Sequence, residues 1–168
     1  MAEKLLLSAL VNNHAGVLLR VAGLFSRRGF NISSLTVCET ENPKFSRMTI
    51  VSEAEPNTFR QIEQQLLKLE DVIKVIRLKD EKYVSSELLL VKVRAENKDR
   101  PAVLQTISKY GARVKDIGHL TITSELTGIP SIIDEFVKEL EAHTIIELTR
   151  SGVTALESGD ISINDDID

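Results

Sequence analysis

The sequence predicts an α+β protein that consists of two consecutive units, each with the element order βαββαβ. Runs with strand-type and helix-type apolar spacing follow one another in this order through residues 5–78. The same order recurs in residues 88–148, after the polar stretch 79–82. A chain of 168 residues with this repeat fits two small domains.

The first strand and helix are separated by a segment rich in turn-forming residues. Residues 5–11 form an apolar run of strand length, and residues 12–16 (Asn-Asn-His-Ala-Gly) interrupt it. From residue 17 onward the apolar side chains fall on one helical face, and Gly29 follows two arginines at the helix end. A strand, a turn and an amphipathic helix are therefore expected.

The rest of the first unit contains two strands, a helix and a final strand. Residues 32–40 and 45–51 alternate between apolar and polar, with a turn at residues 42–43 between them. Residues 72–78 form the last strand. The helix between them has an apolar face composed of Phe59, Ile62, Leu66 and Leu69.

The second unit repeats this order. Residues 88–93 form a strand, Asp99 and Pro101 mark the start of a helix, and Gly111 ends it. The remaining elements are strands at 112–117, 119–124 and 145–148 and a helical face composed of Ile132, Ile133, Phe136, Val137 and Leu140.

These patterns suggest four segments along the chain. We expect a first domain at residues 4–79, a linker at 80–84, a second domain at 85–159 and an acidic tail at 160–168. The tail has few apolar side chains, so we expect it to be disordered.

The composition argues against several classes of protein. A net charge of −4 and a pI of about 5.5 disfavour nucleic-acid binding. The single cysteine, Cys38, fits a reducing compartment, and no signal peptide or membrane-spanning apolar run is evident, so we expect a cytoplasmic protein. The three histidines form no metal-binding pair, and no phosphate-binding or hydrolase motif appears. Acidic residues such as Asp71 are interpreted as solvated charges, and catalysis by this chain is not expected.

Two other protein classes share the βαββαβ order. RNA-recognition modules place aromatic residues on the central strands, where this chain has Val37, Met48 and Ile50. Acylphosphatase-like enzymes need a cationic loop after the first strand. Here residues 12–16 contain no lysine or arginine, and Arg20 lies a turn into the helix. Both classes are therefore disfavoured.

The same loop is a candidate binding site for an amino acid. Free N–H groups at a helix N-terminus favour an anion such as a carboxylate. Gly16 permits close approach of the backbone, and Asn13 offers both a donor and an acceptor, while Asn31 could present a second amide. The alternative is that Asn13 only caps the helix, Gly16 only forms a turn and Asn31 only completes a loop.

Several segments closely resemble the small, regulatory subunit of acetolactate synthase (acetohydroxyacid synthase). The resemblance is carried by residues 13–37, 46–50, 65–69 and 87–93 and by Arg150-Ser151-Gly152. It implies an N-terminal ACT domain and a C-terminal ferredoxin-like domain. It also implies a homodimer in which paired ACT domains bind amino-acid effectors at their interface.

The resemblance further implies a non-catalytic subunit of the acetolactate synthase holoenzyme. Such a subunit activates a separate catalytic subunit, which uses thiamine diphosphate, magnesium and FAD, and confers feedback inhibition by valine or another branched-chain amino acid. No cofactor is expected on this chain itself. The implied effector contacts are Asn13, Gly16, Val17 and Leu18 from one chain and Asn31 and Ile32 from its partner.

The chain departs from the family pattern at two places in its second half. Ser85-Ser86-Glu87 replaces a segment in which many members have arginine before the glutamate, and Glu157-Ser158-Gly159 replaces a common Arg-Gly. Both lie in the region expected to contact the catalytic subunit. A stand-alone amino-acid sensor that acts on another partner is therefore the alternative function.

Overall fold

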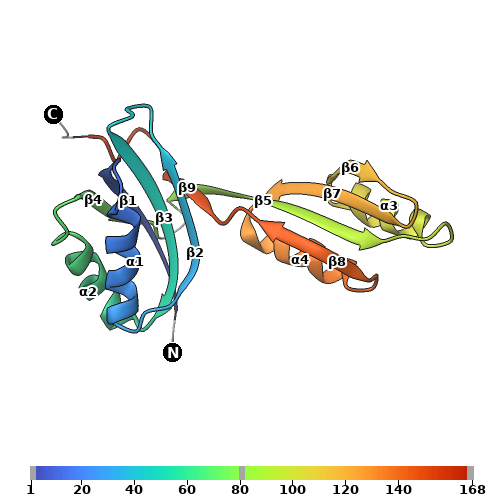
Figure 1. The fold of residues 1–168 in the computed structure, drawn as a ribbon, viewed down its shortest axis with the longest axis horizontal. Helices are drawn as coiled ribbons and strands as arrows, with labels where there is room; N and C mark the ends of the chain where they lie inside the picture. Colours follow the sequence, from blue (N-terminus) through green and yellow to red (C-terminus); the bar gives the residue numbers. More distant parts are fainter. Residues whose placement is uncertain (1–2, 80–81, 166–168) are drawn as a thin grey trace. The chain divides into compact units, whose positions relative to one another are not determined.

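The computed structural model describes residues 3–79 and 82–165, which form two compact units (Figure 1). The first unit contains the chain up to Val84 and the segment from Val153 onward, and the second contains Ser85–Gly152. The elements follow the order βαββαβ twice, and a short additional strand comes last. This order confirms the predicted α+β fold.

The first unit has a four-stranded antiparallel sheet with two helices on one face (Figure 1). The strand order is β2-β3-β1-β4, so β1 and β3 are central. The elements are β1 (Glu3–Asn12), α1 (Val17–Arg27), β2 (Ile32–Glu39), β3 (Phe45–Ala54), α2 (Pro56–Leu66) and β4 (Val72–Arg77). Each helix turns one apolar face toward the sheet, and its buried residues are Val17, Val21, Leu24 and Phe25 in α1 and Phe59, Ile62 and Leu66 in α2.

Strand β1 is buried on both faces of the sheet. Leu7 and Ala9 belong to the core shared with the helices, whereas Ser8 and Leu10 alternate with them and must face the opposite side. Leu10 is nevertheless only 1% exposed. The run at residues 5–11, which is apolar except for Ser8, is therefore explained by a second cover on the open face of the sheet.

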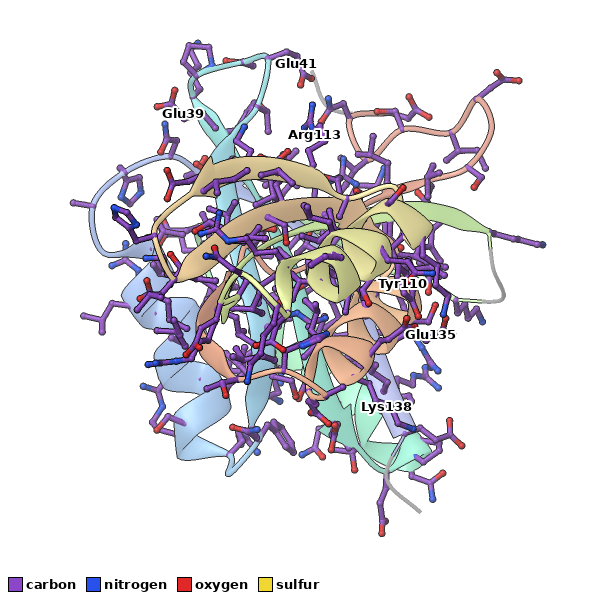
Figure 2. The ribbon with its side chains drawn as sticks, turned by 90° about the vertical axis from the view of Figure 1, so that its right-hand side faces the viewer. Glu39, Glu41, Tyr110, Arg113, Glu135 and Lys138 are labelled. Carbon is purple, nitrogen blue, oxygen red and sulfur yellow. The ribbon has the colours of Figure 1, made fainter. Side chains whose placement is uncertain are left out.

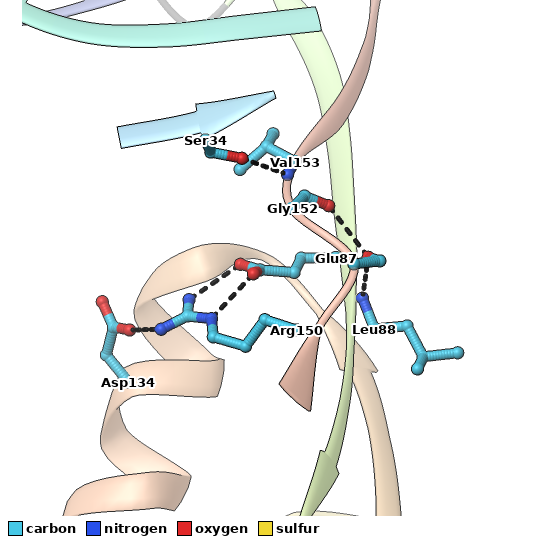
Figure 3. Close-up of polar contacts among 8 residues, drawn as sticks. Ser34, Glu87, Leu88, Asp134, Arg150, Gly152 and Val153 are labelled. Carbon is cyan, nitrogen blue, oxygen red and sulfur yellow. Dashed lines mark hydrogen bonds and ion pairs between the residues drawn. The ribbon is translucent and has the colours of Figure 1, made fainter. Parts of the chain in front are cut away.

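Residues 153–165, here called the C-terminal strap, provide this cover. Strand β9 (Thr154–Glu157) pairs with the beginning of β5 (Tyr83–Arg94). The strap is held by a hydrogen bond from Val153 N to Ser34 Oγ of 3.2 Å (Figure 3) and by one from Lys74 Nζ to the Asp165 carbonyl of 2.9 Å. Val153 and Ala155 of the strap form an apolar cluster with Val51 and Leu78, and the residues at its margin are Leu6, Ile76 and Tyr83.

The strap divides the chain differently from the sequence-based expectation. Residues 153–159 group with the first unit rather than with the second domain. Within the expected tail, Ile163 is only 2% exposed, and residues 166–168 lie outside the described residues. In the expected linker 80–84, residues 80 and 81 are likewise not described, and Tyr83 already begins β5. One buried isoleucine among acidic residues is too weak a pattern to predict this packing.

The second unit repeats the same architecture. Its main strands are ordered β6-β7-β5-β8, and Leu89, Val91 and Val93 of β5 alternate into the core with the helices. The elements after β5 are α3 (Arg100–Lys109), β6 (Arg113–Ile117), β7 (Thr121–Gly128), α4 (Pro130–Leu140) and β8 (Ile145–Arg150). No helix among the described residues is long and apolar enough to cross a membrane.

Polar contacts also join elements within the second unit. Tyr110, which follows the last residue of α3, donates a hydrogen bond from its hydroxyl to Glu139 Oε2 at 3.0 Å (Tyr110 is labelled in Figure 2). Lys109 Nζ lies 2.5 Å from the same carboxylate oxygen.

Strand β7 begins later than the predicted strand at 119–124, because Gly118 N donates a hydrogen bond to Thr121 O and closes a tight turn.

The contribution of the strap can be tested with a matched pair of isoleucines. Ile163→Ala should lower the free energy of unfolding by about 2 kcal/mol, because it removes a buried side chain. Ile161→Ala should change it by less than about 0.5 kcal/mol, since Ile161 is 66% exposed. Urea denaturation measures both values. Equal effects of the two substitutions would contradict the assignment of Ile163 as an anchor.

Candidate functional site

The predicted anion-binding loop lies between β1 and α1. Gly16 is the N-cap of α1 with φ 92° and ψ −15°, a left-handed conformation that favours glycine. No side chain caps this helix, so the alternative in which Asn13 serves only as a cap is wrong. The N–H groups of the first turn of a helix have no carbonyl partner in a preceding turn. This loop therefore presents backbone donors beside a residue without a Cβ.

Asn13 fastens the loop to the hairpin between β2 and β3. Its Nδ2 donates to Glu39 Oε1 and to the Pro43 carbonyl, each at 2.9 Å. Its Oδ1 accepts a hydrogen bond of 3.0 Å from Ser46 Oγ. Since both ends of the amide are engaged, Asn13 positions the loop backbone in this chain. Direct contact of Asn13 with an effector, which the family resemblance implies, stays a prediction.

Asp71 is a second anchor, which the sequence analysis had interpreted as a solvated charge. Its side chain is 11% exposed and lies 2.8 Å from His14 Nε2 and 2.6 Å from Arg20 Nη2. Its backbone carbonyl accepts a hydrogen bond of 2.8 Å from Asn12 N. The interpretation as a solvated charge is wrong, because the chain reversal before β4 brings Asp71 beside the loop. The sequence around Asp71 contains no local pattern that predicts its contacts with His14 and Arg20.

Arg20 and Leu18 determine what surrounds Gly16. A Cβ placed on Gly16 would lie 3.9 Å from Arg20 Nη2, so a guanidinium flanks the N-terminus of α1. This charge and the helix dipole both favour an anion. Leu18 is 46% exposed and can contact a ligand, whereas Val17 is 3% exposed and its side chain belongs to the core.

Asn31 and Ile32 lie at the opposite end of α1 from Gly16. The 11 residues of α1 span roughly 16 Å. A single chain therefore does not bring the two halves of the predicted site together. Asn31 is exposed and its carbonyl accepts a 2.6 Å hydrogen bond from Ser52 Oγ, while Ile32 is half-buried. Ile32 begins β2 and Asn31 precedes it, and β2 is an edge strand of the first sheet, the position at which a sheet can be extended by another strand.

In the second unit, two segments singled out in the sequence are direct partners. Arg150 donates from two nitrogens to the two carboxylate oxygens of Glu87, each at 2.7 Å, and from a third to Asp134 at 2.7 Å (Figure 3). Hydrogen bonding to Glu87 holds the pKa of Arg150 above its ordinary value, so its charge is retained. The segments around Glu87 and Arg150 thus form one structural joint between β5 and the end of β8. Among the described residues, no cluster of three or more potential metal ligands occurs.

The role of Asp71 can be tested by removing its charge. Asp71→Asn should lower the free energy of unfolding by about 1–2 kcal/mol, because Arg20 then loses a charged, largely buried partner. Glu147→Gln is the control, since Glu147 is 66% exposed in its pair with Lys92 and should change stability by less than about 0.5 kcal/mol. Urea denaturation of both variants checks the difference. Comparable losses would show that Asp71 is no more important than a surface charge.

The joint in the second unit offers an internal comparison. Glu87→Gln should cost about 2–3 kcal/mol, because the Glu87 side chain is 4% exposed and forms both bonds of a bidentate pair. Asp134→Asn should cost less than about 0.5 kcal/mol, because Asp134 is 62% exposed and contacts the same arginine. Thermal unfolding with calorimetry distinguishes these values. A larger loss for Asp134→Asn would reverse this assignment.

Comparison with known proteins connects this architecture to one family. A family model described as an AHAS small subunit-like ACT domain matches residues 7–74, and one described as the small subunit of acetolactate synthase matches residues 86–159. The acetolactate synthase small subunit of Mycolicibacterium smegmatis is 42% identical over 153 residues, which cover 91% of this chain and 90% of that protein. The corresponding protein of Haemophilus influenzae is 38% identical, with 94% and 98% covered.

A solved structure agrees with these relatives. The acetolactate synthase small subunit from Thermotoga maritima has a TM-score of 0.86 and 35% sequence identity, and the match covers 95% of this chain and 99% of that one. The two family models together span both units, and the relatives match along nearly their whole length. The chain therefore belongs to the family of acetolactate synthase small subunits.

Proposed function

We propose that this chain is the cytoplasmic regulatory subunit of an acetolactate synthase, activates the catalytic subunit and confers feedback inhibition by valine. The observation that carries the effector assignment is the left-handed Gly16 at the N-terminus of α1, with the Arg20 guanidinium beside it. Family membership supports the catalytic subunit as the partner. Thiamine diphosphate, magnesium and FAD are then cofactors of that partner.

The effector would bind by its charged ends and by its side chain. Its carboxylate would accept hydrogen bonds from the first-turn N–H groups of α1 and would be attracted by Arg20. The exposed Leu18 would contact the aliphatic side chain. Leucine and isoleucine carry the same charged groups as valine and are further candidate effectors.

The second half of the site would come from a partner chain. Pairing of two β2 edge strands would extend the sheet across a homodimer and carry Asn31 and Ile32 of each chain to the neighbouring molecule. An effector bound there would contact both subunits. It would thereby favour one arrangement of the dimer over another.

Inhibition then follows from linkage between two binding equilibria. Valine would favour the dimer arrangement that binds or activates the catalytic subunit less well. Valine and the catalytic subunit would then each weaken the binding of the other by the same free energy, typically ~1–3 kcal/mol. Valine should therefore weaken activation by the regulatory subunit. Reciprocally, the catalytic subunit should weaken valine binding.

Gly16→Asp tests the effector site. An aspartate here would place its carboxylate next to Arg20, where the effector carboxylate is expected, and would raise the valine concentration for half-inhibition at least about tenfold. Activation of the catalytic subunit should persist. The measurement is acetolactate formation by the reconstituted pair, with and without valine.

Gly111→Asp is the matched control. Gly111 also has a positive φ, of 66°, and no atom lies within 4 Å of its Cβ position, so strain and added charge are reproduced far along the chain from the loop. Unchanged inhibition in Gly16→Asp, or equal loss in both variants, would contradict the site. If the wild-type chain neither bound nor stimulated the catalytic subunit, the alternative of a stand-alone amino-acid sensor would be favoured.

A further inference from the structure

A cavity on the other face of the first sheet has no role in the proposed function. It lies between strands β2 and β3 and the C-terminal strap and has a volume of about 300 Å³. Its wall includes charged side chains (Arg47, Glu39 and Glu41) and apolar ones from the strap (Leu156 and Ile163). Its volume is at the lower limit of small-molecule sites.

Arg47 supplies an uncommitted positive charge to this cavity. Its backbone is held on both sides, because it pairs with Leu10 of β1 and with Cys38 of β2. Its side chain is half-buried, and Nε donates to Ser8 Oγ at 2.8 Å. A guanidinium has five N–H donors, and in the described part of the chain Arg47 forms no ion pair. Several donors therefore remain for a ligand.

Burial makes this arginine a favourable partner for a carboxylate. Desolvation lowers the pKa of Arg47, and the negative charges of Glu157 and Glu41 oppose this effect only at a distance. The guanidinium is thus partly removed from water without a direct counter-ion. A bound carboxylate would restore the lost electrostatic stabilisation.

The opposite charge is present in the same cavity. Glu39 and Glu41 both lie at the hairpin that joins β2 and β3 (Figure 2). One oxygen of Glu39 accepts from Asn13 at 2.9 Å, and one oxygen of Glu41 accepts from Asn164. The remaining oxygens suit an ammonium group. These acidic residues would repel a simple anion, and Arg47 would repel a simple amine.

We propose that this cavity is a second binding site for a small apolar α-amino acid. The carboxylate would bind Arg47, the ammonium would face Glu39 and Glu41, and the side chain would pack against Leu156 and Ile163. The site is independent of the Gly16 loop, because its ligand-binding groups come from the strands and the strap. Glu39 nevertheless contacts Asn13, so the cavity and the loop share one carboxylate.

Equilibrium dialysis of radiolabelled L-valine against the full chain tests this proposal. We expect two valine sites per chain in the wild type and one in Gly16→Asp. Adding Arg47→Met to Gly16→Asp should weaken the remaining site at least about tenfold. Adding Arg60→Met should leave it unchanged, since Arg60 is an exposed arginine on α2.

A second variant covers the case in which Arg47→Met fails to fold. Leu156 is 51% exposed, so Leu156→Trp can fill the cavity without changing the core, and it should also weaken the remaining site. Isobutylamine, which lacks the carboxylate, and isovalerate, which lacks the ammonium, should compete at least about tenfold less well than valine.

The outcomes distinguish this proposal from the loop site. Complete loss of valine binding in Gly16→Asp would overturn the second site and leave the proposed function standing. Binding in Gly16→Asp that survives both Arg47→Met and Leu156→Trp would overturn the assignment to this cavity. Equal competition by valine and isobutylamine would overturn the role of Arg47. Absence of valine binding in the wild type would overturn both sites.

Discussion

Burial of β1 on both faces is the constraint on which the first unit depends. Leu7 and Ala9 face the helices, and Leu10 faces the other side, where it is 1% exposed. A sheet with one open face would leave this second apolar row in water. The strap therefore has to return to the first unit after the second one is complete, so the second unit is an insertion in the first. The same return path creates the cavity beside Arg47.

The candidate effector loop illustrates how polar side chains prepare a backbone site. The Asn13 side chain forms hydrogen bonds with the β2–β3 hairpin. The Asp71 carboxylate contacts His14 and Arg20. These contacts hold the segment before Gly16 in place, so the helix N–H groups need not reorganise when a ligand binds. In the proposed effector site, these side chains would position the loop, and the helix N–H groups and Arg20 would contact the ligand. Because the residues that hold the loop differ from those that would face the ligand, the latter could be substituted without loss of the loop conformation.

Local patterns were sufficient to predict most of the fold and the central residue of the candidate site. Apolar spacing located both helices of each unit, and a glycine between a strand and a helix identified the loop. The sequence places Asn13 in this loop, but its contacts with Glu39, Pro43 and Ser46 come from the β2–β3 hairpin and have no local pattern. Asp71 was missed because it approaches Arg20 only through the pairing of β4 with β1. Interactions between residues that are distant in the chain leave no periodic signal.

The two βαββαβ units and the position of Gly16 between the first strand and helix could be read from the sequence, because they depend on local spacing and composition. Folding is what buries Ile163, brings Glu87 and Arg150 together and leaves Arg47 half-buried with no ion pair among the residues that the structure describes. The physical reason is that burial and pairing depend on which surfaces meet after folding. A single isoleucine in an acidic tail has the same local sequence signal whether it is solvated or buried. Ile163 is buried because the C-terminal strap folds with the first unit.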